Sequence, residues 1–547
     1  MYMQGLANFL DDFLGGLILI SYSLVVGSIL WSAWILRIWS GSERAGPALV
    51  ARAVELLRFG AIALAATQGI KLVIKAMILA STLGEFPIAA YAGTVQFKAG
   101  LLRLVLAIAF IWMASRLRAR PYDRTLWNTL VALTIPLVIS GAWLVHGVGR
   151  FENREPLMLL TVIHQFAAAV WVGGVAQLLS LWRLGAIDRT AKILWPQTIY
   201  RFGWLGVASV LLLVATGLPL AWEYVGSWDG LFGTGYGSLV ATKTALLLIA
   251  LYFAYRNHSA GRRWRQGAIN SALMSKVPYY IEAETFILVG VLFIAATLSS
   301  QPPSVDIRDL AVPVADVAEM FSPHVPRLTS PTHEELLAAE PGRVAVVGKI
   351  PSVPGQLWSD YNHNMAGIFL TTMGIVAMLS YLRGFRWAKY WPLGFIGLSI
   401  FLFFRSDAET WPLGPIGFWE STFGNGEVFQ HRVATLLVFC LGIMELRART
   451  NPNSRRLTYL FPVLCAFGGV LLLTHAHAQF ELRSEYLIQS THTAMGLLAV
   501  IMASGRWLEL RLATTEGYTE SRVAGFVAIL AMFIIGNFLL FYREPLY

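Results

Sequence analysis

The stretch LTYLFPVLCAFGGVLLLTHAHAQF, residues 457–480, decides the class of fold. Its first part is an apolar run as long as a membrane-spanning helix, which needs about 20 mostly apolar residues. The run ends in two histidines, His475 and His477, in a chain with only ten histidines among 547 residues. The stretch therefore predicts a membrane span that carries ionisable side chains at one end.

The composition of the whole chain agrees with that prediction. Hydrophobic residues make up 56% of the sequence and charged residues only 14%, whereas soluble globular proteins carry about 25% charged residues. The formal net charge of +10 would suggest a nucleic-acid partner in a soluble protein. Here Lys and Arg lie mostly in short loops between apolar runs, so we exclude nucleic acid and expect the lipid bilayer as the partner.

Apolar runs of spanning length recur along the sequence and predict an all-α, polytopic membrane helix bundle of about fourteen transmembrane helices. The runs are 13–39, 55–81, 96–117, 126–148, 158–182, 201–225, 237–257, 281–300, 362–382, 390–405, 428–446, 457–477, 487–508 and 522–542.

Alternate loops carry the basic residues and predict the orientation of these helices. Loops such as 116–124, 183–192 and 447–456 are rich in Arg and Lys, whereas the short loops between them are poor in both. Basic loops face the cytoplasm in membrane proteins. Strict alternation along the chain then places the N-terminus and the C-terminus both outside.

A Pro-rich segment divides the predicted spans into two blocks. Residues 301–359 open with QPPSVDIRDLAVPVADV and are too short and too rich in proline to bury a large core. We interpret residues 1–300 as an eight-helix membrane domain, 301–359 as a periplasmic linker with a short helix near 334–339, and 360–547 as a six-helix membrane domain that contains histidines.

The histidines gather at one depth in this topology. At 1.5 Å rise per residue, five of them should lie within roughly 10 Å of one outer plane. These are His363, His431, His475, His477 and His492. Two more, His146 and His164, repeat the pattern in the first block.

A layer of imidazoles near the outer face predicts a metal site. Ionisable residues inside a bilayer are rare and usually line an ion path or a site, and imidazole binds Cu, Zn, Fe and Ni. Each histidine alone is better explained by a hydrogen bond to interfacial water or to a neighbouring carbonyl, but five together favour a site. Histidine pairs on neighbouring helices also hold b-type heme, so His431 with His492, or His146 with His164, is the alternative interpretation.

Other polar or soft residues in the predicted spans are weaker candidates. Thioethers and thiols suit Cu(I), although in apolar helices they usually serve packing. These candidates are Met365, Met373, Met378, Met495, Cys440 and Cys465. We expect Gln68, Lys71 and Lys75 to line a cavity or snorkel outward, Lys243 to pair with Glu223, and Glu282 and Glu284 only to mark the inner mouth of a span.

Three stretches of the first block resemble the CopD-type copper resistance family. They are HQFAAAVWVGG at 164–174, RFGWLGVASVLLLVATGLPLAWEYVGSWDGLFGTGYGSLVATKTALLLIAL at 201–251, and YIEAETFILVGVLFIAATLSSQPP at 280–303. The resemblance is specific over about 160–303 and looser over the first four spans. It implies that Trp171, Gly173, Gly174, Trp222 and Lys243 are characteristic positions of the family, with His164 as a possible copper contact.

The same resemblance implies an eight-span bacterial inner-membrane protein for copper uptake from the periplasm, often beside a carrier of the CopC type. Two departures matter. No CopC-like β-domain is fused to this sequence, so copper would arrive free or from a separate carrier. Residues 360–547 lie outside the usual family core, and this extension holds most of the outer histidines.

Together these observations predict a copper-binding and copper-transport protein rather than an enzyme. The sequence has no Walker-type phosphate-binding motif, so transport would be passive or driven by the membrane potential, which favours cation entry by about 2.3 kcal/mol per charge per 100 mV. The alternatives are a membrane oxidoreductase that binds heme b and a scaffold that delivers copper to an oxidase.

Overall fold

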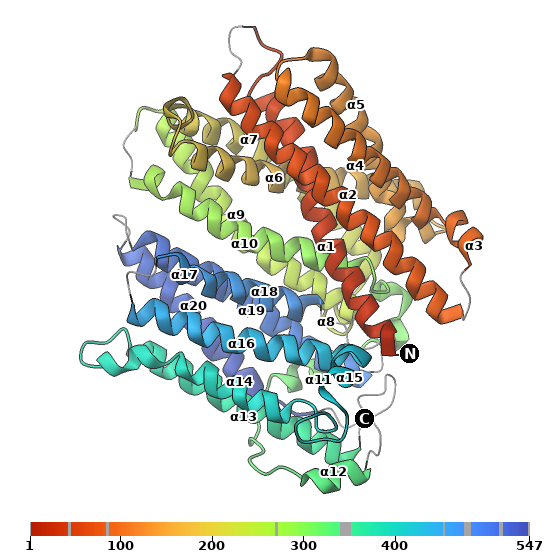
Figure 1. The fold of residues 1–547 in the computed structure, drawn as a ribbon, viewed down its shortest axis with the longest axis vertical. Helices are drawn as coiled ribbons and strands as arrows, with labels where there is room; N and C mark the ends of the chain where they lie inside the picture. The colour runs from red at the N-terminus through yellow and green to blue at the C-terminus, as the bar shows by residue number, and fades with distance from the viewer. Residues whose placement is uncertain are drawn as a thin grey trace. The chain divides into compact units, whose positions relative to one another are not determined.

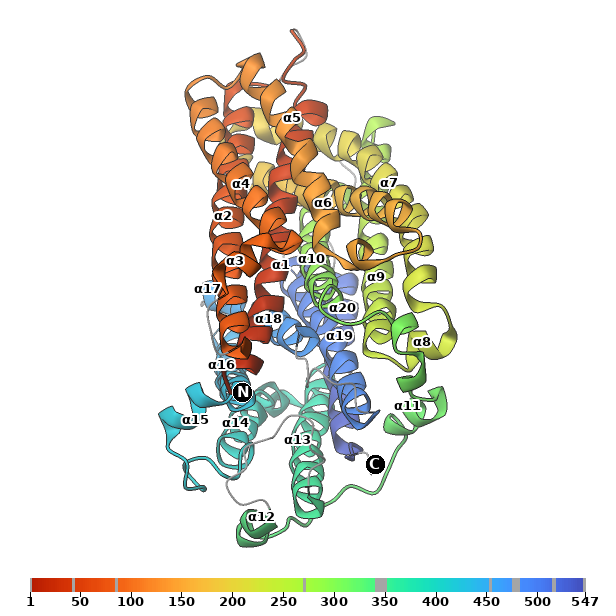
Figure 2. The same ribbon diagram turned by 90° about the vertical axis from the view of Figure 1, so that its right-hand side faces the viewer.

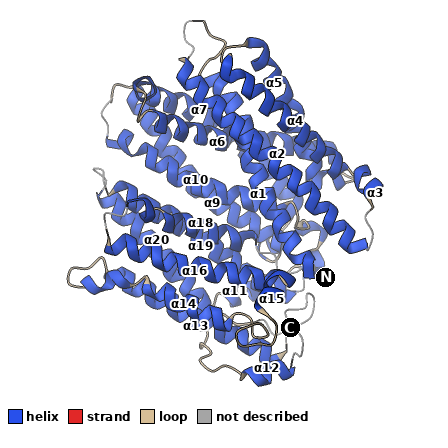
Figure 3. Cartoon of the chain, in the orientation of Figure 1, coloured by secondary structure: helices blue, strands red, loops and turns tan. Residues whose placement is uncertain are grey.

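The computed structural model describes residues 2–41, 45–83, 87–268, 272–339, 352–451, 455–474, 483–513 and 518–544. Regular structure in these ranges is helical, and none of the described residues forms a strand (Figure 3). The one β-type feature there is an isolated bridge between Thr410 and Ile416. The prediction of an all-α fold is confirmed.

A helix lies at each of the eight apolar runs of the first block. Several helices extend past the predicted span because polar residues continue them into the loops. The helices are α1 (Tyr2–Leu30), α2 (Pro47–Leu83), α4 (Val95–Ala119), α5 (Arg124–Ile139), α6 (Arg154–Leu184), α7 (Arg189–Val225), α9 (Gly235–Arg265) and α10 (Ala272–Leu298).

The six runs of the second block are helical as well. They correspond to α13 (Val353–Leu379), α14 (Leu393–Arg405), α16 (Gly426–Thr450), α18 (Leu460–Thr474), α19 (Arg483–Leu512) and α20 (Tyr518–Leu540). Across the described ranges, eleven helices are long and apolar enough to cross a membrane, and α18 is a shorter apolar helix. The chain is therefore a multi-pass helical membrane protein.

Short helices lie between the long ones. They are α3 (Ile88–Gly93), α8 (Trp228–Phe232), α11 (Val314–Met320), α12 (His333–Ala339), α15 (Phe418–Gly424) and α17 (Arg455–Thr458). Helix α12 confirms the short helix predicted near residues 334–339.

The contacts divide the chain into two units. The first consists of Met1–Phe9, Ser227–Thr242 and Asp306–Tyr547, and the second of Leu10–Gly226 and Lys243–Val305. We call them the C-terminal unit and the N-terminal unit, after the part of the chain that supplies most of each.

Helix α6 is central to the N-terminal unit, where it packs against α7, α2 and α10. It also approaches α1 so closely that neither helix tolerates a side chain at the crossing. A Cβ atom on Gly173 would collide with the backbone of Ser23 and Gly27, and one on Gly27 would collide with Gly173. Small residues allow such close contact between membrane helices, which explains why glycine occupies both positions.

The polar stripe of α2 reaches a carboxylate on α1. Lys75 Nζ lies 2.9 Å and Lys71 Nζ 3.3 Å from the two carboxylate oxygens of Asp11. Ser300, just after α10, donates a hydrogen bond to Asp12. These contacts show that the two lysines are paired with α1 rather than directed to the bilayer surface.

Six helices of the C-terminal unit close into a ring, and Figures 1 and 2 show the bundle from two directions. Each helix packs against two neighbours in the order α13, α20, α19, α18, α16, α14 and back to α13. The α13–α20 contact is the tightest, because a Cβ on Gly367 would collide with the backbone of Leu540. This ring matches the six runs of the second block.

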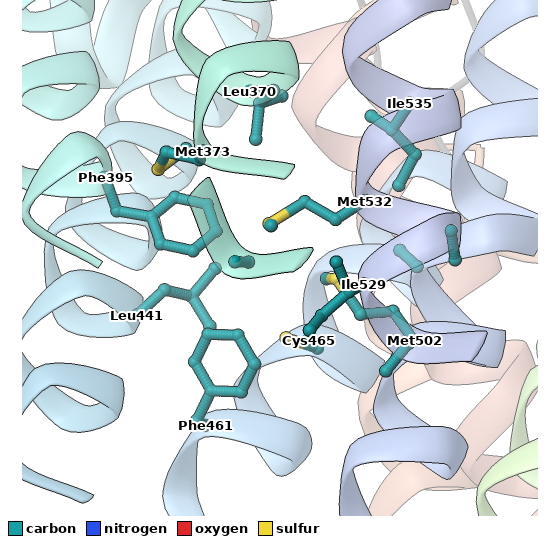
Figure 4. Close-up of a cluster of buried hydrophobic side chains, with 14 of the residues drawn as sticks. Leu370, Met373, Phe395, Leu441, Phe461, Cys465, Met502, Ile529, Met532 and Ile535 are labelled. Atoms are coloured by element: carbon teal, nitrogen blue, oxygen red, sulfur yellow. The ribbon is translucent and has the colours of Figure 1, made fainter. Parts of the chain in front are cut away.

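Apolar side chains from all six helices fill the ring, as Figure 4 shows for part of the cluster. The buried members of this cluster include Met373, Leu370, Phe395, Leu441, Phe461, Cys465, Met502, Ile529 and Met532. A closed ring with a filled interior holds its helices in fixed register, so side chains at one end of it keep fixed positions.

A buried ionic network ties α16 to α19 and to Tyr381, which follows α13. Glu445 is fully buried and pairs with Arg449 at 2.6 Å and with Arg506 at 2.9 Å. Arg506 also contacts Glu509, which accepts a hydrogen bond from the Tyr381 hydroxyl. Each charge therefore has an opposite partner inside the bundle, as buried ions require.

Candidate metal site

His363 on α13 and His492 on α19 have the same local hydrogen bond. His363 Nδ1 lies 2.9 Å from the Ser359 carbonyl oxygen, and His492 Nδ1 lies 2.9 Å from the Ile488 carbonyl oxygen. Because a carbonyl oxygen only accepts, Nδ1 carries the proton and Nε2 is the basic nitrogen of each neutral ring. Metal-binding histidines use this arrangement, in which one ring nitrogen is fixed by a hydrogen bond and the other ligates.

The two rings are in contact, with the edge of one against the other. Their centroids lie 6.2 Å apart and their planes cross at 88°. His431 on α16 is near enough that a charge on its ring acts on both. His363 and His492 are therefore in contact at one end of the ring of helices, with His431 in the same region, which we call the histidine end.

His431 has a carboxylate partner. Its Nδ1 lies 2.8 Å from Oδ1 of Asp407, in the loop that follows α14. Burial alone would raise the pKa of the Asp407 carboxyl, but His431 and a hydrogen bond from Ser406 hold that pKa below its usual value. The carboxylate thus remains charged and fixes the orientation of the imidazole, as in carboxylate–histidine–metal arrangements.

Further polar groups surround His363. Its ring packs on that of Tyr542 with centroids 4.1 Å apart, and its Nδ1 is also 3.2 Å from Ser359 Oγ. Ser359 in turn donates to Glu544, and the Glu544 backbone N–H donates to Asp360. Carboxylates therefore lie near the histidine end, and the C-terminal segment contributes one of them, Glu544.

His475 and His477 lie outside the described residues, so their place in the site stays a prediction. In sequence they follow directly on Thr474, the last residue of α18. Helix α18 packs against both α16 and α19, which carry His431 and His492.

The two candidate histidines of the N-terminal unit, His146 and His164, have separate protein partners. His146 Nε2 lies 2.9 Å from the carbonyl oxygen of Leu298, and His164 Nδ1 lies 2.9 Å from the hydroxyl of Thr216. Lys243 is close enough for its charge to act on His164. In the described part of the chain Lys243 forms no ion pair with Glu223, so the expected Lys243–Glu223 pair was wrong.

No group of three or more His, Cys, Asp or Glu side chains within the described ranges is arranged to hold a metal ion. The histidine end therefore offers two facing imidazoles with a third nearby, rather than a closed coordination shell.

Sulfur atoms lie further along the same helices. Met373 follows His363 on α13 by ten residues and Met502 follows His492 on α19 by ten, each a rise of about 15 Å. Both belong to the buried cluster that also contains Cys465, Met495 and Met532 (Figure 4). One core therefore contains methionine thioethers from α13, α19 and α20 and the Cys465 thiol of α18. The spacing of these residues along the sequence did not reveal that they share it.

The sequence did not identify Asp407, and it gave Glu284 only a boundary role. Asp407 lies in a loop between predicted spans, and only the folded chain brings it to His431. Glu284 is 1% exposed and accepts a hydrogen bond from Trp171 Nε1 at 2.8 Å. It is therefore no marker of a membrane boundary. The one signal for it was a carboxylate inside an apolar run.

Comparison with known proteins supports the resemblance seen in the first block. Residues 196–298 match the family model of copper resistance protein D, CopD. The chain is also 27% identical over 180 residues to the copper transport protein CutJ of Bacillus subtilis (strain 168). That match spans 32% of this chain and 31% of CutJ. No solved structure is significantly similar to the chain.

Proposed function

We propose, from the CopD-type segment at residues 196–298, that this multi-pass membrane protein binds copper ions on the periplasmic side of a bacterial inner membrane and transfers them into or across it. The observation that carries the proposal is the convergence of His363, His492 and His431 from three helices at one end of a closed bundle. Copper is the cargo in this proposal, and no enzymatic step is needed.

The topology completes the proposal. Fourteen spans with both termini outside would put the histidine end at the periplasmic face, together with His146 and His164. In this arrangement residues 1–300 form a CopD-like domain, 301–359 a periplasmic linker and 360–547 a domain that captures the ion. A separate carrier of the CopC type is the expected partner for delivery.

The donor atoms at the histidine end and in the sulfur-containing core support movement of the copper ion rather than its storage. Imidazole nitrogens bind both Cu(I) and Cu(II), whereas thioether and thiol groups select Cu(I). The histidine end followed by the sulfur atoms of Met373, Met502, Met532 and Cys465 forms a series of progressively softer donors. An ion that leaves the imidazoles therefore meets ligands that favour the reduced form.

Copper uptake by proteoliposomes tests this function. Vesicles with the full chain should accumulate copper faster than empty vesicles, and the His363→Ala/His492→Ala variant should lose most of that excess. A His324→Ala variant is the matched control, because His324 lies in the linker and its Nδ1 is hydrogen-bonded to the carbonyl oxygen of Ser322, two residues away. Equal uptake by wild type and the double variant would contradict the proposal.

Heme b is the rival occupant of the facing imidazoles, since two axial histidines are a common way to hold it. The visible spectrum of the purified protein separates the two. The copper proposal predicts no Soret band, whereas a Soret band that disappears in the double variant would establish the heme-binding alternative.

A further inference from the structure

The carboxyl group of Glu284 lies inside the N-terminal unit, where three helices enclose it. Its residue is 1% exposed on α10. Oε1 accepts a hydrogen bond from Trp171 Nε1 of α6 at 2.8 Å, and Oε2 accepts one from Asn257 Nδ2 of α9 at 2.9 Å. Both donors are uncharged.

No cation of the described chain pairs with this carboxyl group. Arg256, next to Asn257, instead donates to the Tyr280 hydroxyl and lies over its ring. His258 packs against Trp204. Lys243 lies near His164 on α6.

The remaining charges of the neighbouring helices also lie elsewhere. Glu282 precedes Glu284 by two positions, which turns it to another side of α10, and Lys276 lies more than two turns earlier on the same helix. On α1, Asp12 accepts from Ser300, about 24 Å along the helix direction from Glu284. Glu284 is thus a buried carboxyl with polar but neutral surroundings.

We propose that Glu284 is a proton-binding site within the membrane, at which the CopD-type unit takes up and releases one proton. A charged carboxylate without a cation is costly inside a bilayer and neutralises instead. The proton is taken from bulk water, forms an O–H bond on the carboxyl and returns to bulk water on release. No oxidant or reductant takes part.

The residues around Glu284 can form hydrogen bonds with both the charged and the protonated form of its carboxyl group. Two N–H donors stabilise the carboxylate. The protonated acid needs an acceptor, and the buried Asn257 Oδ1 has no hydrogen-bond partner. Rotation of the Asn257 amide by half a turn would bring this oxygen to the acid proton, so one side chain serves the charged and the neutral state in turn.

This inference goes beyond copper binding, because it concerns a site in the other unit and a different ion. The proton proposal is tested without copper. If it fails, the copper proposal is unaffected, and failure of the copper proposal leaves the proton proposal unaffected.

Infrared difference spectroscopy of the copper-free full chain in nanodiscs, titrated from neutral to alkaline pH, tests the proposal. The wild type should lose the C=O stretch of a protonated carboxylic acid and gain carboxylate bands. Glu284→Gln should lack this signal, and the matched control Glu282→Gln should retain it. A signal of the same size in Glu284→Gln would overturn the proposal.

A second variant keeps the test valid if Glu284→Gln fails to fold. Trp171→Phe removes an N–H donor that favours the carboxylate, so the midpoint of the titration should move to higher pH. A midpoint identical to that of the wild type would show that the titrating carboxyl is not the one held by Trp171, and this result would also overturn the proposal.

Discussion

The imidazole rings of His363 and His492 lie 6.2 Å apart between centroids and almost perpendicular, although they come from different helices, α13 and α19. Two imidazoles that bind one metal ion at about 2 Å have centroids roughly 5 to 6 Å apart. The observed separation is therefore close to that of a shared ligand sphere.

Replacement of the carboxylate behind His431 should weaken copper binding. Asp407→Asn removes the charge that fixes the His431 imidazole, and loss of such a partner typically lowers metal affinity by about 10- to 100-fold. Copper titration in competition with a chelator measures this change. Asp309→Asn, an exposed carboxylate in the linker, should leave the affinity unchanged; an equal loss in both variants would remove the special role of Asp407.

The same pair makes the stability of the protein depend on pH. Since the folded pKa of Asp407 is below its usual value, its contribution is fully present above the unfolded pKa of about 3.9 and is lost as pH falls through the folded pKa. The melting temperature of the wild type should exceed that of Asp407→Asn at neutral pH, and the gap should shrink in acid. A gap of constant size down to strongly acidic pH would contradict this assignment.

The positions of the helices were predictable from the sequence because membrane spans depend on length and hydrophobicity alone. The fourteen apolar runs all coincide with helices, and the CopD-type resemblance was visible in its motifs. Side-chain partners were not predictable in the same way. His363 meets Tyr542 because α13 packs against α20, the last helix of the ring, and His431 meets Asp407 because α16 packs against α14.

Glu284 illustrates the same limit. Its position near a basic loop suggested an exposed boundary residue, yet α10 turns it toward Trp171 and Asn257. Rotation of a helix about its own axis depends on packing against its neighbours, and an apolar run that is hydrophobic on all sides does not encode it.

The contact between α1 and α6 should be highly sensitive to side-chain size. Gly173→Ala adds a methyl group that collides with the Ser23 carbonyl region, and overpacking of this kind costs typically about 1–3 kcal/mol. Thermal inactivation of the purified chain should therefore occur at lower temperature. The matched control is Gly69→Ala on α2, where open space surrounds the added methyl group, and comparable losses in the two variants would argue against the close approach.

The sulfur atoms of the C-terminal core should matter for copper movement more than for folding. Met532→Leu conserves volume, a change that usually costs under about 1.5 kcal/mol, but it removes a thioether from the centre of the cluster. Copper uptake by proteoliposomes should fall while copper bound at the histidine end stays the same. Ile529→Leu, at a buried neighbouring position, serves as the control, and unchanged uptake in Met532→Leu would exclude this thioether from the path.

Copper content of the purified full chain tests the central claim most directly. After loading and removal of loosely bound metal, the wild type and His324→Ala should retain the same amount of copper per chain, and His363→Ala/His492→Ala should retain clearly less. If the double variant folds normally and holds as much copper as the wild type, the facing imidazoles of α13 and α19 do not bind the ion.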